Sequence, residues 1–206
     1  MKRNTSQWLS VLLHCGVRVQ VGSIWAPIFA QVIDETTFSK GEDEVPDFLS
    51  QILHESKLLE DLEEDLHYVT PGRLMAVWPR RFLSLADERP YLRNPEALAN
   101  KVYGGRMGNI QPGWGWRYRG SGLIQITGAD NYRAVQAATG VPVFDHPELL
   151  RQATPEALRV VIAWWEGNVP DVCMGNVRKV TRAVNGGTNG LQDRIALADK
   201  ASEALT

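Results

Sequence analysis

Cysteine is scarce in this chain of 206 residues, and no CxxC pair occurs. Cys15 and Cys173 lie in unrelated sequence contexts. We therefore expect two free thiols, without a disulfide scaffold and without a zinc site or other metal. A chain of this length buries enough surface to fold without such a cross-link.

A long, uninterrupted apolar run is also missing. The chain begins Met-Lys-Arg and turns apolar at Trp8, but His14, Arg18 and Gln20 interrupt the run, and no small-residue cleavage site follows. This pattern argues against a cleaved signal peptide and against stable insertion into a membrane. We expect residues 6–33 to form two helices of the fold. The alternative is an uncleaved, weakly inserting export segment.

Net charge is small, at −2 with a pI near 6.1, so nothing suggests nucleic acid as a partner. The small total conceals an asymmetry. Residues 34–66 hold twelve of the twenty-four acids and only two lysines, whereas the rest of the chain has twenty basic and twelve acidic residues. Crowded carboxylates raise the pKa of one of them. A protonated carboxyl beside an ionised one is what cleavage of a glycosidic bond requires.

Helical signals dominate and predict a mainly α fold. Thr70-Pro71, Asn94-Pro95 and Thr154-Pro155 each place a capping residue before a proline, and Asn176 is expected to cap a helix that Gly186-Gly187 ends. Seven glycines between residues 104 and 122 predict a loop, with at most a small β-hairpin at 116–126. We expect residues 1–206 to form a single domain without a second binding domain.

The acidic segment contains two candidate catalytic carboxylates. Glu55 follows His54 at the end of an apolar helical pattern, and Glu64 comes nine residues later. On one continuous helix these side chains would point to opposite faces, about 13–14 Å apart along the axis. They can act together only if the helix ends soon after Glu55, so that Glu64 returns on the following segment.

Two other motifs supply neutral polar groups. Gln125 and Thr127 alternate with isoleucines, so in an extended segment both polar side chains would share one face. An amide and a hydroxyl can position a water molecule or an N-acetyl group without changing the charge of the carboxylates. Asn185-Gly186-Gly187, followed by Asp193-Arg194, forms the other motif, in which the glycines would let a sugar approach closely.

In their order and spacing these motifs resemble family 19 glycoside hydrolases, the chitinase-like branch of the lysozyme superfamily, and among them most closely bacteriophage endolysins. The resemblance runs from about Trp25 to the C-terminus. It implies a lysozyme-like helical domain with a catalytic cleft. It also implies a hydrolase that inverts the configuration of the cleaved bond without a cofactor. The anchoring residues are His54-Glu55-Ser56, Glu64, Arg119-Gly120-Ser121-Gly122, Gln125-Ile126-Thr127, Asn131-Tyr132, Asn185-Gly186-Gly187 and Asp193-Arg194.

The resemblance implies a role for each matching residue. Glu55 would be the general acid, Glu64 the general base, and Thr127 would hold the attacking water. Four further positions match residues that contact sugar or support the carboxylates, and Tyr132 adjoins one of them, so the predicted substrate-binding set is Gln125, Asn131, Tyr132, Asn185 and Arg194.

This chain departs from the family's pattern on both sides of the expected base. The family often has glycines after His-Glu-Ser, where this chain has Lys57 and Leu58, and the family's Leu-Asn-Tyr is here Leu66-His67-Tyr68. Glu60, Glu63 and Asp65 therefore remain alternatives to Glu64. The spacing of Glu55, Glu64 and Thr70 also resembles the triad of another phage lysozyme family, although a capping role explains Thr70 more simply.

The expected function is that of an endolysin, which hydrolyses the β-1,4 glycan strands of peptidoglycan during host lysis. By analogy with the family, we expect a monomer that accumulates in the host cytoplasm and reaches the periplasmic cell wall through a holin-type pore. A chitinase and a non-catalytic glycan-binding domain are the alternatives.

Overall fold

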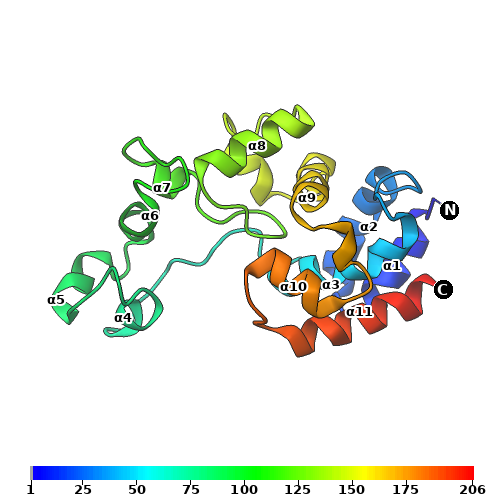
Figure 1. Ribbon diagram of the computed structural model, residues 1–206, viewed down its shortest axis with the longest axis horizontal. Coiled ribbons are helices and arrows are strands. Elements are labelled where there is room, and N and C mark those ends of the chain that lie inside the picture. Colours follow the sequence, from blue (N-terminus) through cyan, green and yellow to red (C-terminus); the bar gives the residue numbers. More distant parts are fainter. Residues whose placement is uncertain (1) are drawn as a thin grey trace.

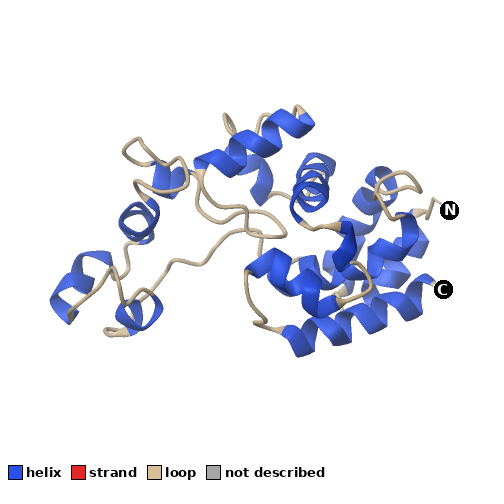
Figure 2. Ribbon diagram, viewed as in Figure 1, coloured by secondary structure: helices blue, strands red, loops and turns tan. Residues whose placement is uncertain are grey.

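The computed structural model describes residues 2–206 and is mainly helical. Within that range it contains eleven α-helices joined by loops and four short 3-10 helices, and β-structure is limited to two isolated bridges (Figures 1 and 2). The α-helices are α1 (Thr5–His14), α2 (Val19–Val32), α3 (Val45–Glu55), α4 (Arg73–Val77), α5 (Leu85–Glu88), α6 (Pro95–Tyr103), α7 (Trp114–Arg117), α8 (Ala129–Thr139), α9 (Pro155–Asn168), α10 (Val177–Asn185) and α11 (Leu191–Leu205). The 3-10 helices are η1 (Gly41–Glu44), η2 (Arg89–Tyr91), η3 (Pro147–Arg151) and η4 (Asp171–Cys173).

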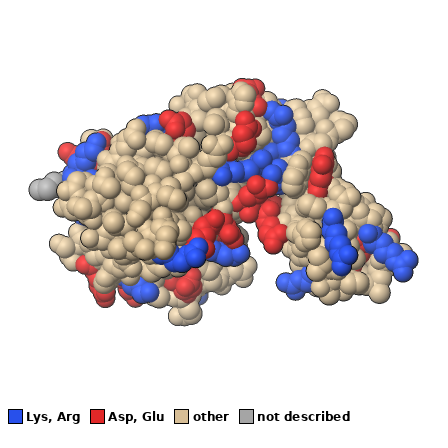
Figure 3. All heavy atoms as spheres, turned by 180° about the vertical axis from the view of Figure 1, so that it is seen from behind, with Lys and Arg blue, Asp and Glu red and all other residues tan. Residues whose placement is uncertain are grey.

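These helices form two lobes of unequal size (Figure 1). The large lobe packs α1–α3 and α8–α11 around one apolar core, in which Trp8, Trp25 and Trp165 are fully or almost fully buried. The small lobe, α4–α7, has its own core, which includes Leu74 and Phe82. Seen from behind, a notch separates the lobes, and Asp and Glu side chains lie at its edge (Figure 3).

The two N-terminal helices belong to the large lobe, as predicted. α1 and α2 pack on each other and contribute Trp8, Val11, Leu12 and Phe29 to its core. Among the described residues, no helix has both the length and the apolar character that a bilayer span needs.

Most of the predicted helix caps are present. The side chains of Asn94, Thr154 and Asn176 accept hydrogen bonds from the backbone N–H groups three residues later, and Gly186 ends α10 with φ +74°. Thr70 is the exception. α4 begins at Arg73, after a left-handed Gly72, and Thr70 contributes its backbone carbonyl to the turn. The prediction that Thr70 caps this helix is therefore wrong.

The glycine-rich segment is mostly loop but contains the short helix α7. Ser121 makes isolated antiparallel bridges to Glu63 and to Ile126, and no longer strand is present in this segment, in keeping with the prediction of at most a small hairpin. Gln125 has a left-handed φ of +55°, so the chain turns at that residue instead of running extended. The alternation of burial still holds, because Ile124 and Ile126 are buried while Gln125 and Thr127 are half-buried.

Candidate active site

Helix α3 ends at Glu55, as cooperation between Glu55 and Glu64 requires. Ser56 closes the helix: its hydroxyl donates to the carbonyl of Ile52 at 2.6 Å and accepts from the N–H of Leu59 at 2.9 Å. Lys57, Leu58 and Leu59 then have φ values of 47°, 62° and 71°, which form a left-handed turn. Glycine adopts this conformation without steric cost, whereas other residues pay about 1–2 kcal/mol each. Lys57, Leu58 and Leu59 therefore occupy a backbone region that glycine would adopt without this cost.

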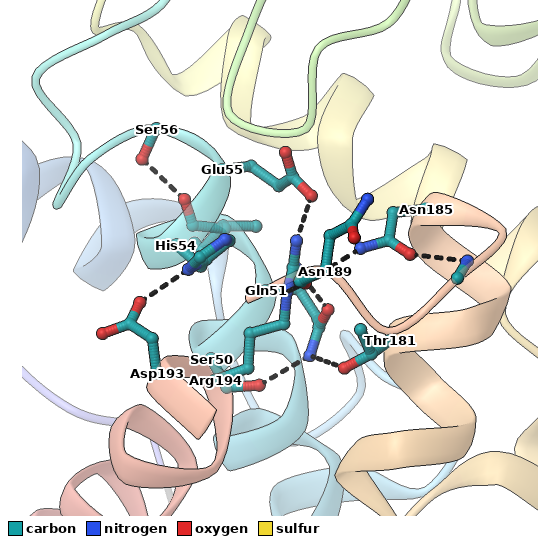
Figure 4. Close-up of polar contacts among 12 residues, drawn as sticks. Ser50, Gln51, His54, Glu55, Ser56, Thr181, Asn185, Asn189, Asp193 and Arg194 are labelled. Atoms are coloured by element: carbon teal, nitrogen blue, oxygen red, sulfur yellow. Dashed lines mark hydrogen bonds and ion pairs between the residues drawn. The ribbon is translucent and has the colours of Figure 1, made fainter. Parts of the chain in front are cut away.

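Arg194 holds the Glu55 carboxylate (Figure 4). Its guanidinium is 1% exposed, pairs with Oε1 of Glu55 through Nη2, and donates through Nη1 to Oε1 of Gln51 at 2.5 Å. The Glu55 side chain is 23% exposed, and its second oxygen has no partner among the described residues. A buried cation thus fixes one oxygen of Glu55 and leaves the other available to a ligand.

His54 and Asp193 form a second contact between the same two helices. Nδ1 of His54 lies 2.6 Å from Oδ2 of Asp193 (Figure 4). Two adjacent residues at the start of α11 therefore hold two adjacent residues at the end of α3. Gly190 packs closely against this pair, since a Cβ atom there would lie 2.2 Å from Cε1 and Nε2 of His54. His54 is in this way fixed as a support of the α3 end.

Glu64 lies on the segment that leads from the large lobe to the small lobe. Its backbone N–H donates to the carbonyl of Gly120 at 2.9 Å, and its Oε2 accepts from the N–H of Gly120 at 3.3 Å. The hydroxyl of Tyr103 donates to Oε1 at 2.5 Å. Burial, followed by the charge of Glu64, raises the pKa of Tyr103, so this phenol stays protonated and remains a donor.

The other acids of this run have partners elsewhere. Glu60 pairs with Arg18 at 2.6 Å, Glu63 pairs with Arg119, and Asp65 accepts the N–H of His67 at 2.8 Å. Glu64 is the member of the run that contacts both Tyr103 of the small lobe and the loop at Gly120. Its position therefore fits the general base better than the positions of its three neighbours do.

Two carboxyl groups of the large lobe have raised pKa values, and burial is the largest cause in both. Burial raises the pKa of Asp47, and the charge of Glu44 adds to this effect. Burial likewise raises the pKa of Glu166, again with a contribution from Glu44. In both groups the nearby charge of Glu44 adds to the effect of burial, so neighbouring acids contribute to these two shifts.

The loop around Gln125 lies beside Glu64. A Cβ atom on Gly120 would lie 2.7 Å from Oε1 of Gln125 and 3.1 Å from Cβ of Glu64, so both side chains contact this glycine. The hydroxyl of Thr127 donates to the carbonyl of Gln125 at 2.9 Å, and Nδ2 of Asn131 donates to the carbonyl of Thr127 at 2.8 Å. These bonds keep the predicted water-holding and sugar-binding residues in one turn.

Asn185 stands at the end of α10 and bonds to the loop that leads to α11. Its Oδ1 accepts the N–H of Gly187 at 2.8 Å, and its Nδ2 donates to the carbonyl of Asn189 at 3.2 Å (Figure 4). The same Asn189 carbonyl accepts Nε of Arg194 at 3.3 Å. Asn185 is therefore linked to the support of Glu55 through a single peptide group.

Two residues of the predicted substrate-binding set are buried. Tyr132 is fully buried, and its hydroxyl donates to the carbonyl of Arg119 at 3.0 Å. Arg194 is equally inaccessible. Neither position fits direct contact with a sugar. We correct the role of Tyr132 to support of the segment that carries Gly120. For Arg194, support of a carboxylate is the one of its two predicted roles that fits its position.

Tyr103 and Gln51 are site residues that the sequence motifs do not identify. Gln51 stands one helical turn before Glu55, so the spacing of four residues could have indicated it. Nothing near Tyr103 in the sequence points to Glu64, because the contact joins two lobes. Within residues 2–206, no group of three or more His, Cys, Asp or Glu side chains could hold a metal, and both cysteines are free.

The fold and these two separately held carboxylates define the class of protein as a glycoside hydrolase with a lysozyme-like helical fold. The chain belongs to glycosyl hydrolase family 19. It is 33% identical over 184 residues to a glycosyl hydrolase family 19 domain-containing protein of Haemophilus influenzae, covering 86% of each chain. An endochitinase of Arabidopsis thaliana is 33% identical over 73 residues, which is 35% of this chain and 26% of that one. No family model matches the chain.

Solved structures share the fold. Chitinase C from Streptomyces griseus superposes with a TM-score of 0.53 at 18% identity, over 98% of this chain and 91% of that chain. A bacterial family 19 chitinase superposes with a TM-score of 0.52 at 19% identity, over 99% and 89%.

Proposed function

We propose that this glycoside hydrolase cleaves the β-1,4 glycan strands of peptidoglycan, with Glu55 as the general acid and Glu64 as the general base. The observation that carries the proposal is how the two carboxylates are held. Buried Arg194 of the large lobe holds one oxygen of Glu55, whereas Tyr103 of the small lobe holds one oxygen of Glu64. Two carboxylates presented from separate supports suit a mechanism in which they act on opposite faces of one sugar.

In the proposed reaction, Glu55 protonates the glycosidic oxygen through the oxygen that Arg194 leaves free. The bond from the anomeric carbon to that oxygen then breaks. Glu64 accepts a proton from water, whose oxygen attacks the anomeric carbon from the opposite face, with Thr127 and Gln125 orienting the water or the N-acetyl group. After transfer Glu55 is an anion, and the guanidinium of Arg194 lies beside it as the counter-ion. The configuration at the anomeric carbon inverts.

Charge supports peptidoglycan as the substrate. Residues 67–117, which include the small lobe, contain eight Lys and Arg against three Asp and Glu. Peptidoglycan carries carboxylates on its peptide stems, whereas chitin is uncharged. A basic lobe beside the carboxylates attracts an anionic polymer such as peptidoglycan. It exerts no such electrostatic attraction on a neutral polymer such as chitin.

Replacing the general acid tests the assignment. Glu55→Gln keeps the shape of the side chain but supplies no proton, and general acid catalysis contributes roughly 10²–10⁴-fold. We expect at least a hundred-fold loss in the release of new reducing ends from purified peptidoglycan, and loss of lysis of permeabilised Gram-negative cells. Glu60→Gln, in the same acidic segment but paired with Arg18, is the matched control and should retain activity. Substantial lysis by Glu55→Gln would refute the role of Glu55.

Product analysis separates the remaining claims. Proton NMR of fresh product should show the α anomer first, and early β anomer would contradict inversion. Mass spectrometry of digested peptidoglycan identifies the new reducing-end sugar, and hence which of the two alternating linkages is cut.

The biological role we propose is that of an endolysin. The enzyme, a monomer whose two lobes form one catalytic domain, would wait in the cytoplasm of the infected host and reach the cell wall through a holin-type pore. Co-expression with and without such a pore, followed by turbidity, tests the export step. Light scattering tests the oligomeric state.

Chitin is the second candidate substrate. The names of the similar proteins favour it, because an Arabidopsis endochitinase and a Streptomyces chitinase are among them. Parallel assays on colloidal chitin and on purified cell wall decide between the two.

A further inference from the structure

The small lobe contains a cavity of about 500 Å³ that the glycosidase mechanism does not use. Three arginines, one tryptophan and two small apolar residues line it: Val77, Trp78, Pro79, Arg80, Arg81 and Arg106. The volume falls within the range of small-molecule sites. Its lining combines apolar side chains with three arginines.

No ion pair is formed by these arginines with any described residue, and Arg106 donates only a long 3.4 Å bond, to the carbonyl of Val102. Two of the three acids in residues 67–117 are occupied with backbone groups. Glu88 is buried and accepts the N–H groups of Gly72 and Met75, both at 2.6 Å, and Asp87 accepts that of Leu83 at 3.0 Å. With eight Lys and Arg against three Asp and Glu in residues 67–117, the positive charge of the cavity exceeds what the acids of the lobe could balance.

The cavity lies close to Glu64. Arg106 follows Tyr103, the donor to Glu64, by three residues, and its charge acts on the Tyr103 hydroxyl. The ring of Trp78 meets the ring of Tyr68 edge-to-face at 5.4 Å, and burial followed by the charge of Glu64 raises the pKa of Tyr68. The cavity is therefore connected to the surroundings of the proposed base through Trp78 and Tyr68 and through Arg106 and Tyr103. Figure 3 shows Lys and Arg groups spread over the small lobe beside the notch.

We propose that this arginine cavity binds a carboxylate of the peptide stem attached to the glycan strand. The proposal rests on the proposed peptidoglycan hydrolase function and names the part of the substrate that the small lobe recognises. Guanidinium groups bind carboxylates through paired, charge-assisted hydrogen bonds, and Val77, Trp78 and Pro79 suit the aliphatic part of a short peptide. Chitin has no such carboxylate, so the cavity would select peptidoglycan over chitin.

The first test measures binding without catalysis. The probe is a soluble stem tetrapeptide with free carboxylates, titrated calorimetrically into the wild-type protein and into the triple variant Arg80→Gln/Arg81→Gln/Arg106→Gln. We expect at least tenfold weaker binding to the variant, and a similar loss when the carboxylates of the peptide are amidated. The control variant Arg73→Gln/Arg89→Gln/Arg93→Gln removes the same charge from the same lobe outside the cavity, and should bind normally.

The second test measures hydrolysis of two substrates. On peptidoglycan with intact stems, the cavity variant should show about a tenfold higher KM at low salt, with kcat unchanged. On the same glycan stripped of its stems, the cavity variant and wild type should be equal.

The proposal would be overturned if the cavity and control variants lost equal affinity for the peptide, or if the wild-type protein did not bind the peptide. Failure of the proposed function is a different result, namely hydrolysis of chitin but not of peptidoglycan by wild type. In that case the calorimetric titration still shows whether the cavity binds the peptide, because it does not depend on turnover.

Discussion

The two carboxylates of the site differ in what holds them. Glu55 pairs with the buried guanidinium of Arg194, whereas Glu64 accepts hydrogen bonds from the hydroxyl of Tyr103 and from a backbone N–H group. The residue that distinguishes the surroundings of Glu64 is Tyr103.

Tyr103→Phe removes one hydroxyl and leaves the ring in place. Hydrogen bonds to charged groups contribute about 1.5–3 kcal/mol, and each 1.4 kcal/mol is a factor of ten in rate. We expect kcat to fall about tenfold or more, with little change in KM, because the lost bond orients the base and does not bind the sugar. Steady-state kinetics on purified cell wall measures the effect.

Tyr91→Phe is the matched control, since Tyr91 packs on the same small-lobe core. It should leave kcat unchanged. Equal kcat for Tyr103→Phe and wild type would show that this hydroxyl does not position Glu64.

At the level of elements, the site depends on where α11 begins. Asp193 and Arg194 stand in its first turn and hold His54 and Glu55 at the last turn of α3. Successive residues on a helix point about 100° apart, so two adjacent contacts fix both the rotation and the position of the α3 end. The left-handed Gly190 at the start of α11 permits the close approach.

Gly190→Ala tests this junction. The residue has φ +69°, and its new methyl group would lie 2.2 Å from the His54 ring. A left-handed alanine costs about 1–2 kcal/mol, and the clash adds a cost of about 1–3 kcal/mol. We expect a lower Tm together with a loss of glycan hydrolysis, measured by thermal denaturation and by activity below the new Tm.

Gly140→Ala separates the two costs. Gly140 has a similar φ of +72°, but a Cβ atom there meets nothing within 4 Å. This variant should show the backbone cost alone, and its activity should remain normal. If both variants lose equal stability and both stay active, the contact of Gly190 with His54 contributes neither to stability nor to hydrolysis.

At the scale of the whole molecule, the large lobe carries an electrostatic cost in its core. Asp47 is 4% exposed and near Glu44, and its carboxylate accepts the N–H of Gly175 at 2.7 Å. Burial is the largest effect on its pKa and raises it. A carboxyl with a raised pKa binds its proton more tightly in the folded state, so stability is lost as the pH rises from about 3.8 through the folded pKa.

Asp47→Asn should remove this loss, because an amide does not ionise and its oxygen can still accept from Gly175. We expect the Tm of the variant relative to wild type to increase as the pH rises through that window. Asp34→Asn should give the opposite slope at the acidic end, below about pH 3.8, because hydrogen bonds from Thr36 lower the pKa of the exposed Asp34. Thermal denaturation from about pH 2 to pH 7.5 measures both, and a pH-independent difference for Asp47→Asn would contradict the assignment.

Local chemistry explains which features could be predicted. The caps at Asn94, Thr154 and Asn176 each involve a side chain and a backbone group three residues away, and the end of α3 follows from a pattern within one helix. Local patterns say less where a distant partner takes part. Two residues outside the segment 119–126 contact it, since Glu63 bridges to Ser121 and Glu64 exchanges bonds with Gly120.

The sequence by itself determined the mainly helical class, most of the caps and the order of motifs that includes Glu55, because these depend on neighbours a few residues apart. Only the tertiary structure decided that Glu64, among the acids of its run, contacts Tyr103 of the small lobe. It also decided that Arg194, 139 residues from Glu55 in the sequence, pairs with the Glu55 carboxylate. It likewise brought Arg106 beside Arg80 and Arg81 in one cavity. The physical reason is that burial and ion pairing depend on which surfaces meet when helices pack, and these surfaces come from segments far apart in the chain.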